Sequence, residues 1–247
     1  MDFLSRHVTL VLLGLPLFVF VGMMLFFLVG RRAKLRRLAG DPQTTMDDLG
    51  AVKAAIFGLL GLLIAFTFAG AAGRIEKRRD LAVQEAIAIG NAWNCVDTLP
   101  PATQPPIREG LRSYVESRLE TYRLVPDLDA VMAEAQHSSE LADGIWREAV
   151  TACETPRGQP VRLLVLRGLE GAFNLFQIRV ANALHHPPWV VWAMLFLLAM
   201  LSAWIAGYGV SSPGRSNRTY MTVFALTTAI AVYVILDMEF PRAGMVT

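Results

Sequence analysis

The sequence predicts an all-α membrane protein with four transmembrane helices and a helical soluble segment between the second and third. Hydrophobic residues make up 54% of the 247 residues, whereas a soluble domain has about 45–50%. The mean hydropathy is +0.42. The excess lies in long apolar runs at both ends, while the middle shows no strand-like alternation. Together these observations exclude a simple soluble enzyme.

The first two apolar runs are long enough to span a bilayer. Residues 8–30 contain no charged residue, and as a helix they would reach about 34 Å against a hydrocarbon core of ~30 Å. The basic cluster follows this run and does not precede it, which favours a retained helix over a signal peptide. The second run, residues 51–73, contains only Lys53, near its start, where a lysine can reach the interface.

The last two runs form a second hairpin. The third, residues 189–210, begins with Trp189 and Trp192, and aromatic rings favour the membrane interface. The fourth, residues 219–236, ends at Asp237. The predicted organisation is therefore one transmembrane hairpin in 1–73, a helical soluble segment in 74–187, and a second hairpin with a short tail in 188–247.

Small residues recur at about four-residue spacing in the second span. Such a stripe permits close contact with another helix in a bilayer, although glycine and alanine are also common in membrane helices in general. The stripe consists of Gly58, Gly61, Ala65, Ala69 and Gly73.

The distribution of basic residues predicts the orientation. Loops rich in lysine and arginine stay in the cytoplasm, which places both termini and the central segment outside it. A basic run that includes Arg74 and Lys77, on the central side of the second span, opposes this orientation. The basic residues of the two short loops are Arg31, Arg32, Lys34, Arg36 and Arg37, and Arg215 and Arg218.

The central segment is predicted to be a series of helices. The second span continues without a breaker to about Asp97, and prolines at 100, 101, 105 and 106 then force a connection. Apolar residues at helical spacing predict a helix around 111–122, which ends before Pro126. Three more helices are predicted at 128–137, 140–154 and 160–184, the second of them capped by Ser138 or Ser139.

Cysteine and histidine give no firm site. An extracytoplasmic central segment would allow Cys95 and Cys153 to form a disulfide, and the alternative is two reduced, buried thiols. His185 and His186 precede two prolines and lack further metal ligands. Residues 217–219 match a glycosylation sequon, but in a loop predicted to be cytoplasmic. We therefore predict no metal, no cofactor and no enzymatic activity. The net charge of +2 gives no indication of nucleic acid binding.

Two charged clusters flank the second and fourth spans on the same side of the membrane. A carboxylate directly after an apolar run is costly unless it is paired, so we expect ion pairs between the clusters. The alternatives are solvated charges at helix ends, or a direct role in an ion pathway. The cluster residues are Arg74, Arg78, Arg79 and Glu85 after the second span, and Asp237 and Glu239 after the fourth.

Three segments resemble the bestrophin-like family of bacterial membrane proteins, a domain family of unknown function. They are GLLGLLIAFTFAGAAGRIEKRRDLAVQEAIAIGNAW (Gly58 to Trp93), HPPWVVWAMLFLLAMLSAWIAGYG (His186 to Gly209) and VYVILDMEFPRAGMV (Val232 to Val246). The resemblance implies a multi-pass protein of the bacterial inner membrane. It also implies a cytoplasmic soluble segment, because bestrophins place theirs there, in conflict with the basic-residue distribution.

The resemblance further implies a function, because bestrophins are pentameric anion channels whose second membrane helix lines the pore. The second span would then line a pore shared among subunits of a homo-oligomer that conducts anions. Phe57, Ile64 and Phe68 lie on one helical face and could form an apolar constriction; the alternative is ordinary packed or lipid-facing side chains. The competing functional interpretation is a non-conducting scaffold or sensor that binds a partner through its central helices.

Overall fold

The computed structural model describes residues 8–40, 50–124, 127–183, 187–209 and 215–239. Nearly all of these residues are helical and none of them is in a strand, which confirms the predicted all-α class. The chain divides into two compact units, one with Glu76–His186 and one with His7–Ile75 and Pro187–Thr247. Among the described residues, four helices are long and apolar enough to cross a membrane, namely α2, α3, α7 and α8. The helices are α2 (Val8–Gly40), α3 (Gly50–Val96), α4 (Gln104–Arg123), α5 (Leu128–Cys153), α6 (Arg162–Ala183), α7 (Trp189–Gly209) and α8 (Arg215–Glu239).

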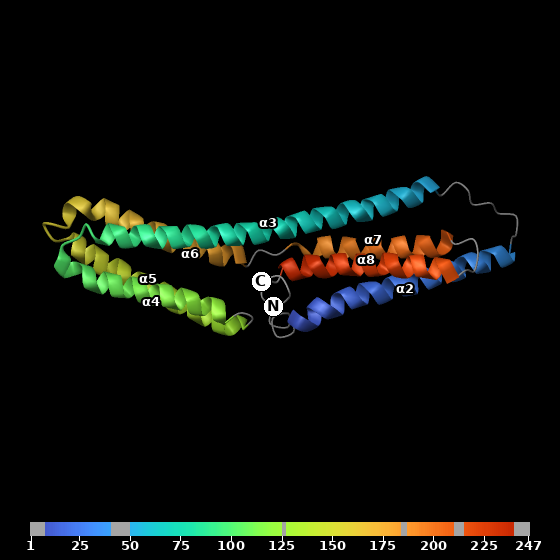
Figure 1. The fold of residues 1–247 in the computed structure, drawn as a ribbon, viewed down its shortest axis with the longest axis horizontal. Helices are drawn as coiled ribbons and strands as arrows, with labels where there is room; N and C mark the ends of the chain where they lie inside the picture. The colour runs from blue at the N-terminus through green and yellow to red at the C-terminus, as the bar shows by residue number, and fades with distance from the viewer. Residues whose placement is uncertain (1–7, 41–49, 125–126, 184–186, 210–214, 240–247) are drawn as a thin grey trace. The chain divides into compact units, whose positions relative to one another are not determined.

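In the unit with the candidate spans, α2, α7, α8 and the first part of α3 pack around one apolar core (Figure 1). Only 11% of the most apolar window of α3 is buried inside the chain, against 28–44% for the other three spans. The first part of α3 is therefore the span with the least contact to its own chain. The core side chains are Leu12, Val19, Met23 and Phe27 of α2, Leu60 of α3, Leu195, Leu198, Ala199 and Ala203 of α7, and Met221, Ala225, Val232 and Leu236 of α8.

The backbones of α2 and α7 meet at two glycines. A Cβ atom built on Gly30 would lie 2.1 Å from the carbonyl oxygen of Trp204. A Cβ atom built on Gly207 would lie 2.1 Å from the carbonyl oxygen of Phe27. Close approach of this kind needs residues without side chains, so Gly30 and Gly207 together permit this helix crossing.

In the other unit, α4, α5, α6 and the second part of α3 enclose a separate apolar core. The N-terminus of α5 is capped by Asp127, whose carboxylate accepts a hydrogen bond from the Ala130 amide at 3.2 Å. Cys95 and Cys153 are both free thiols, and burial raises the pKa of Cys153. The core includes Ala92 and Val96 of α3, Ile107, Leu111 and Tyr114 of α4, Ile145 and Ala149 of α5, and Val165, Leu169 and Phe176 of α6.

The predicted break around residue 138 is wrong, because α5 runs unbroken from Leu128 to Cys153. Ser138 is fully buried inside this helix and hydrogen bonds to Ser117 of α4. Its hydroxyl therefore has a partner across a helix interface and is not needed as a cap. The first span is also longer than predicted, since α2 continues to Gly40. His185 and His186 lie outside the described residues.

Candidate functional site

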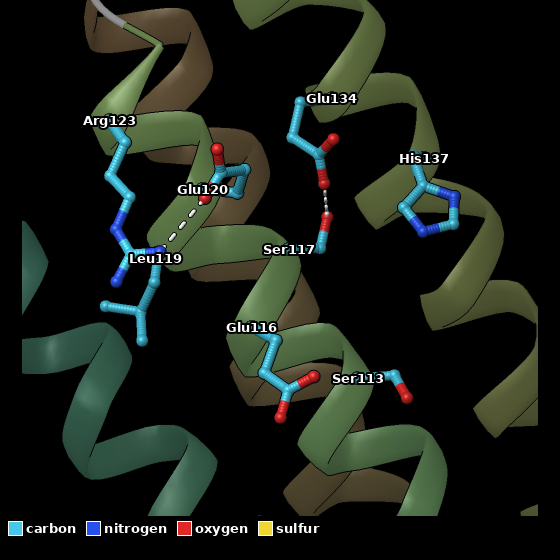
Figure 2. A pocket seen from close by; sticks show the side chains of 8 residues that line it. All are labelled: Ser113, Glu116, Ser117, Leu119, Glu120, Arg123, Glu134 and His137. Carbon is cyan, nitrogen blue, oxygen red and sulfur yellow. Dashed lines mark hydrogen bonds and ion pairs between the residues drawn. The ribbon is translucent and has the colours of Figure 1, made fainter.

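A groove of about 510 Å³ lies between α4 and α5 (Figure 2). Its walls carry three carboxylates, Glu116, Glu120 and Glu134, and one guanidinium, Arg123. Arg123 pairs with Glu120 at 3.2 Å, which leaves the groove with an acidic character. The other lining residues are Ser113, Ser117, Leu119 and His137.

A hydrogen-bonded chain leads from this groove into the helix interface. The Ser117 hydroxyl donates to Glu134, so its oxygen accepts from the buried Ser138 hydroxyl at 2.7 Å. The Thr121 hydroxyl in turn donates to the Ser117 carbonyl at 2.9 Å. These bonds satisfy polar groups that would be costly to bury alone.

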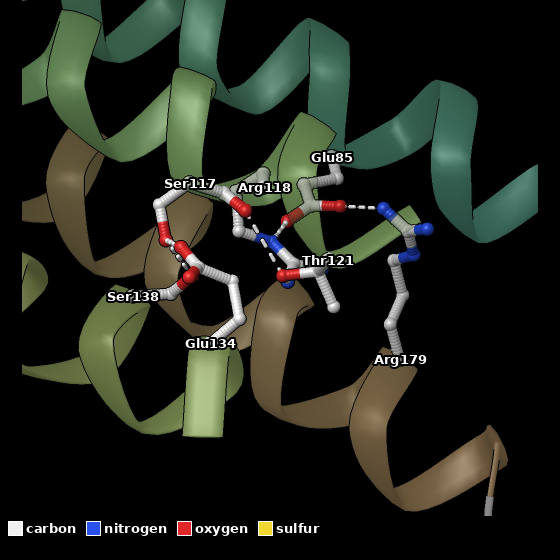
Figure 3. Close-up of polar contacts among 7 residues, drawn as sticks. All are labelled: Glu85, Ser117, Arg118, Thr121, Glu134, Ser138 and Arg179. Atoms are coloured by element: carbon white, nitrogen blue, oxygen red, sulfur yellow. Dashed lines mark hydrogen bonds and ion pairs between the residues drawn. The ribbon is translucent and has the colours of Figure 1, made fainter. Parts of the chain in front are cut away.

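The residue after Ser117, Arg118, points to the other side of α4 and joins a buried ion-pair cluster (Figure 3). Glu85 of α3 accepts from Arg118 Nε at 2.9 Å and, through its second oxygen, from Arg179 of α6. The side chains of Glu85, Arg118 and Arg179 are only 4%, 8% and 15% exposed. One carboxylate therefore links α3 to both α4 and α6. We define these three residues as the Glu85 cluster.

Aromatic rings complete the surroundings of the two arginines. The Arg118 guanidinium lies 4.2 Å from the Phe176 ring centre, and the Arg179 guanidinium lies 4.8 Å from that of Tyr122. Arg118 of α4 thus lies over a ring of α6, and Arg179 of α6 lies over a ring of α4. The π face of each ring attracts the positive charge of the guanidinium. This contact partly compensates the second arginine, which Glu85 alone does not neutralise.

Tyr114 lies one helical turn before Arg118 and is fully buried. Burial raises the pKa of its phenol above the ordinary value, and the Glu85 carboxylate adds to the rise. Within the described part of the chain the Tyr114 hydroxyl has no hydrogen-bond partner. Burial also lowers the pKa of Arg179. The Glu85 cluster is therefore a charged site inside an otherwise apolar interior.

The charged cluster predicted from sequence is divided between the two units. In the membrane unit, Arg74 donates to Glu239 at 2.8 Å through Nε, and its Nη2 lies 2.7 Å from the same oxygen. This pair joins the end of the second predicted span to the end of the fourth. Asp237 is buried and Arg79 is exposed. Glu85 pairs with Arg118 and Arg179, as described above, and these two partners were not predicted.

A signal for both arginines was present in the sequence. Arg118 lies four residues from Tyr114 and from Tyr122, on the apolar face of its helix. Arg179 follows Phe176 by three residues in the same way. A charged residue on an apolar helix face is expected to be buried and paired with an opposite charge. Periodicity alone does not identify the carboxylate that pairs with it.

The residues of the predicted constriction occupy different environments. The Phe57 ring packs edge to face on Phe224 of α8, with centroids 5.3 Å apart. Ile64 packs against the membrane-unit core. Phe68 is 45% exposed. The constriction formed by all three remains a prediction.

The small-residue stripe of α3 faces away from the core. Gly58, Gly61, Ala65, Ala69 and Gly73 are all exposed, and no atom lies within 4 Å of a Cβ built on any of the three glycines. The packed side of the helix carries the core residue Leu60 and the fully buried Ala71. The predicted close helix contact is therefore not made by these glycines within the described part of one chain. We call the five residues the outward face of α3.

Comparison with known proteins gives one match. The model of the bestrophin-like domain matches residues 13–246, nearly the whole chain. No curated protein and no solved structure matches the chain. The matched range includes the second, third and fourth candidate spans, all of the first span but its first residue, and the Glu85 cluster. The chain therefore belongs to the bestrophin-like family.

Proposed function

We propose that this protein is an oligomeric anion channel of the bacterial inner membrane, in which α3 of each copy faces the shared pore. The outward face of α3 carries this proposal. A helix that contributes little to its own chain's core, and that presents small side chains outward, suits either a pore lining or close contact with a neighbouring copy. The assignment to the bestrophin-like family also supports the proposal, because it makes this chain a membrane protein of a family that is compatible with channel function.

The basic residues near the end of the predicted second span suit the same function. Arg78 and Arg79 lie four and five residues after Arg74 in α3, and clustered positive charges raise the local concentration of anions. Phe68, the exposed member of the predicted constriction, lies near the outward face and could narrow a pore by excluding water.

The proposal predicts that the outward face of α3 contacts water. With Ala65→Cys, a negatively charged methanethiosulfonate reagent should reduce the current of the purified protein in planar bilayers. The matched control is Leu59→Cys, on an exposed flank of the same helix, where the reagent should have no effect. The unsubstituted protein reports any contribution from Cys95 and Cys153. Equal effects at both positions would contradict a lining by this face.

The unsubstituted protein supplies the primary test. Its current should reverse near the equilibrium potential for chloride in asymmetric salt, and its mass in detergent should be that of a closed ring of copies. The channel proposal would be wrong if no current flowed at any tested voltage, pH or calcium concentration. It would also be wrong if the protein had the mass of a monomer.

We also propose that both termini and the central segment are extracytoplasmic, as the basic-residue distribution predicts. In cells that express a Cys95→Ala/Cys153→Ala background, a membrane-impermeant maleimide should label Glu148→Cys, on the exposed surface of α5. It should label Arg36→Cys, near the end of α2, only after permeabilisation. The reverse pattern would place the central segment in the cytoplasm, as in bestrophins.

The second candidate function is a non-conducting scaffold or sensor, favoured by the acidic groove between α4 and α5. Its wall includes Leu119, which is 54% exposed. Exposed apolar and acidic groups together suit a cationic, partly apolar partner. Binding of such a partner without any current would favour this function over the channel.

A further inference from the structure

Basic side chains gather around the C-terminal end of α7. Arg37, near the end of α2, donates to the Tyr208 hydroxyl at 3.0 Å. Tyr208 stacks on Trp204, with ring centroids 5.4 Å apart and an interplanar angle of 19°. The pair lies in the last two turns of α7, where aromatic rings are typical of the membrane interface.

A second cation approaches the same helix end from α3. The Lys53 ammonium lies 3.0 Å from the position that a Cβ on Gly209 would occupy, and Gly209 is the last residue of α7. Lys53 is half-buried. Partial negative charge at a helix C-terminus attracts cations. This attraction explains the position of the Lys53 ammonium, but it does not explain why several basic side chains lie near this helix end.

Two faces of α2 differ in this region. Lys34 and Arg37 continue the row of Met23, Phe27 and Gly30, the face that packs against α7 and the core, because successive members are four and three residues apart. Lys34 is half-buried. Arg32 and Arg36 lie on the other side of α2 and are exposed. Arg37 is itself exposed, but its hydrogen bond to Tyr208 holds it on the α7 side, whereas Arg32 and Arg36 project from the opposite side of α2.

These basic side chains carry no counter-charge among the residues that the structure describes. Neither Lys34, Arg37 nor Lys53 forms an ion pair there. Arg37 and Lys53 reach the adjacent residues Tyr208 and Gly209 at the end of α7, and Lys34 lies one turn before Arg37 on the same face of α2. Cations gathered at one helix end repel one another unless an anion lies near them. The phosphate of a membrane lipid carries such a charge, and aromatic rings such as Trp204 and Tyr208 are typical of the level at which lipid headgroups lie.

We infer that Lys34, Arg37 and Lys53, with Tyr208, bind the phosphate headgroup of an anionic phospholipid. Arginine and lysine donors suit phosphate oxygens, and basic pockets between membrane helices bind anionic headgroups. The Arg37–Tyr208 bond positions the guanidinium, and the Trp204 ring packs beside the glycerol region. This site does not depend on whether the protein conducts ions.

The test is lipid retention by the purified full-length protein, measured by native mass spectrometry. The protein is presented with equal amounts of phosphatidylglycerol and phosphatidylcholine of the same acyl chains. Lys34→Gln/Arg37→Gln should weaken phosphatidylglycerol binding about 30-fold. The matched control, Arg32→Gln/Arg36→Gln, removes two charges from the same turns and should weaken it less than about threefold. Phosphatidylcholine retention should not change.

Each alternative has a distinct outcome. Equal losses in the two double variants would show diffuse attraction and overturn the site. Unchanged phosphatidylglycerol binding in both double variants would also overturn the site. That result is expected if Asp41, Asp47 or Asp48, between α2 and α3 in the sequence, supplied the counter-charge. Displacement of the lipid by equimolar inorganic phosphate would identify a free-anion site instead. If Lys34→Gln/Arg37→Gln fails to fold, Tyr208→Phe must still lower phosphatidylglycerol retention selectively.

Discussion

Replacing Glu85 by glutamine is expected to lower the free energy of unfolding by about 3–5 kcal/mol, because it leaves two buried arginines without their carboxylate. The side chains of both arginines are at least 85% buried, by their exposures of 8% and 15%, so water screens little of the repulsion. Thermal unfolding of the full-length protein in detergent measures the loss. Hydrogen exchange should locate it, with faster exchange in α4 and α6 and unchanged exchange in α2 and α7.

Two comparisons distinguish buried charge from lost packing. Glu76→Gln changes an exposed carboxylate of the same helix and should alter stability by less than about 0.5 kcal/mol. The triple variant Glu85→Leu/Arg118→Met/Arg179→Met removes every charge of the Glu85 cluster, and it should recover most of the loss. Equal destabilisation by Glu76→Gln and Glu85→Gln would contradict the assigned role of the cluster.

The spans were predictable from sequence because a bilayer imposes a length of apolar chain that few other environments require. The third predicted span, 189–210, begins where α7 begins and covers the whole of that helix, Trp189–Gly209. The continuation of the second span to about Asp97 was also predicted, and α3 ends at Val96. Where no breaker interrupts an apolar or amphipathic pattern, the backbone hydrogen bonds continue the helix, so its end follows from local chemistry.

Pairing across helices was less predictable. The sequence grouped Glu85 with arginines of its own helix, but its partners Arg118 and Arg179 are 33 and 94 residues away. Ser138 shows the same limit. As a serine just before a helix predicted to begin at residue 140, it suggested a cap, but inside α5 its hydroxyl bonds to Ser117 of α4. Such choices depend on tertiary contacts, which periodicity does not encode.

Close helix packing was expected at the small-residue stripe of the second span, yet the glycines at which the backbones of two helices meet are Gly30 and Gly207. Gly207→Ala is expected to destabilise the membrane unit by about 1–3 kcal/mol, because its Cβ would meet the Phe27 carbonyl, a backbone group that cannot rotate away. Gly30→Ala should have a similar effect. The melting temperature of the purified protein measures both. The matched control is Gly14→Ala in α2, where a Cβ meets nothing within 4 Å.

The double variant decides whether the two glycines act at one crossing. If α2 and α7 must separate to admit either methyl group, the separation caused by the first makes room for part of the second. The loss in Gly30→Ala/Gly207→Ala should then be smaller than the sum of the single losses, since neighbouring sites that share one backbone shift are not additive. Strict additivity would mean that each methyl group is accommodated by its own local adjustment, and the crossing would not be the common cause.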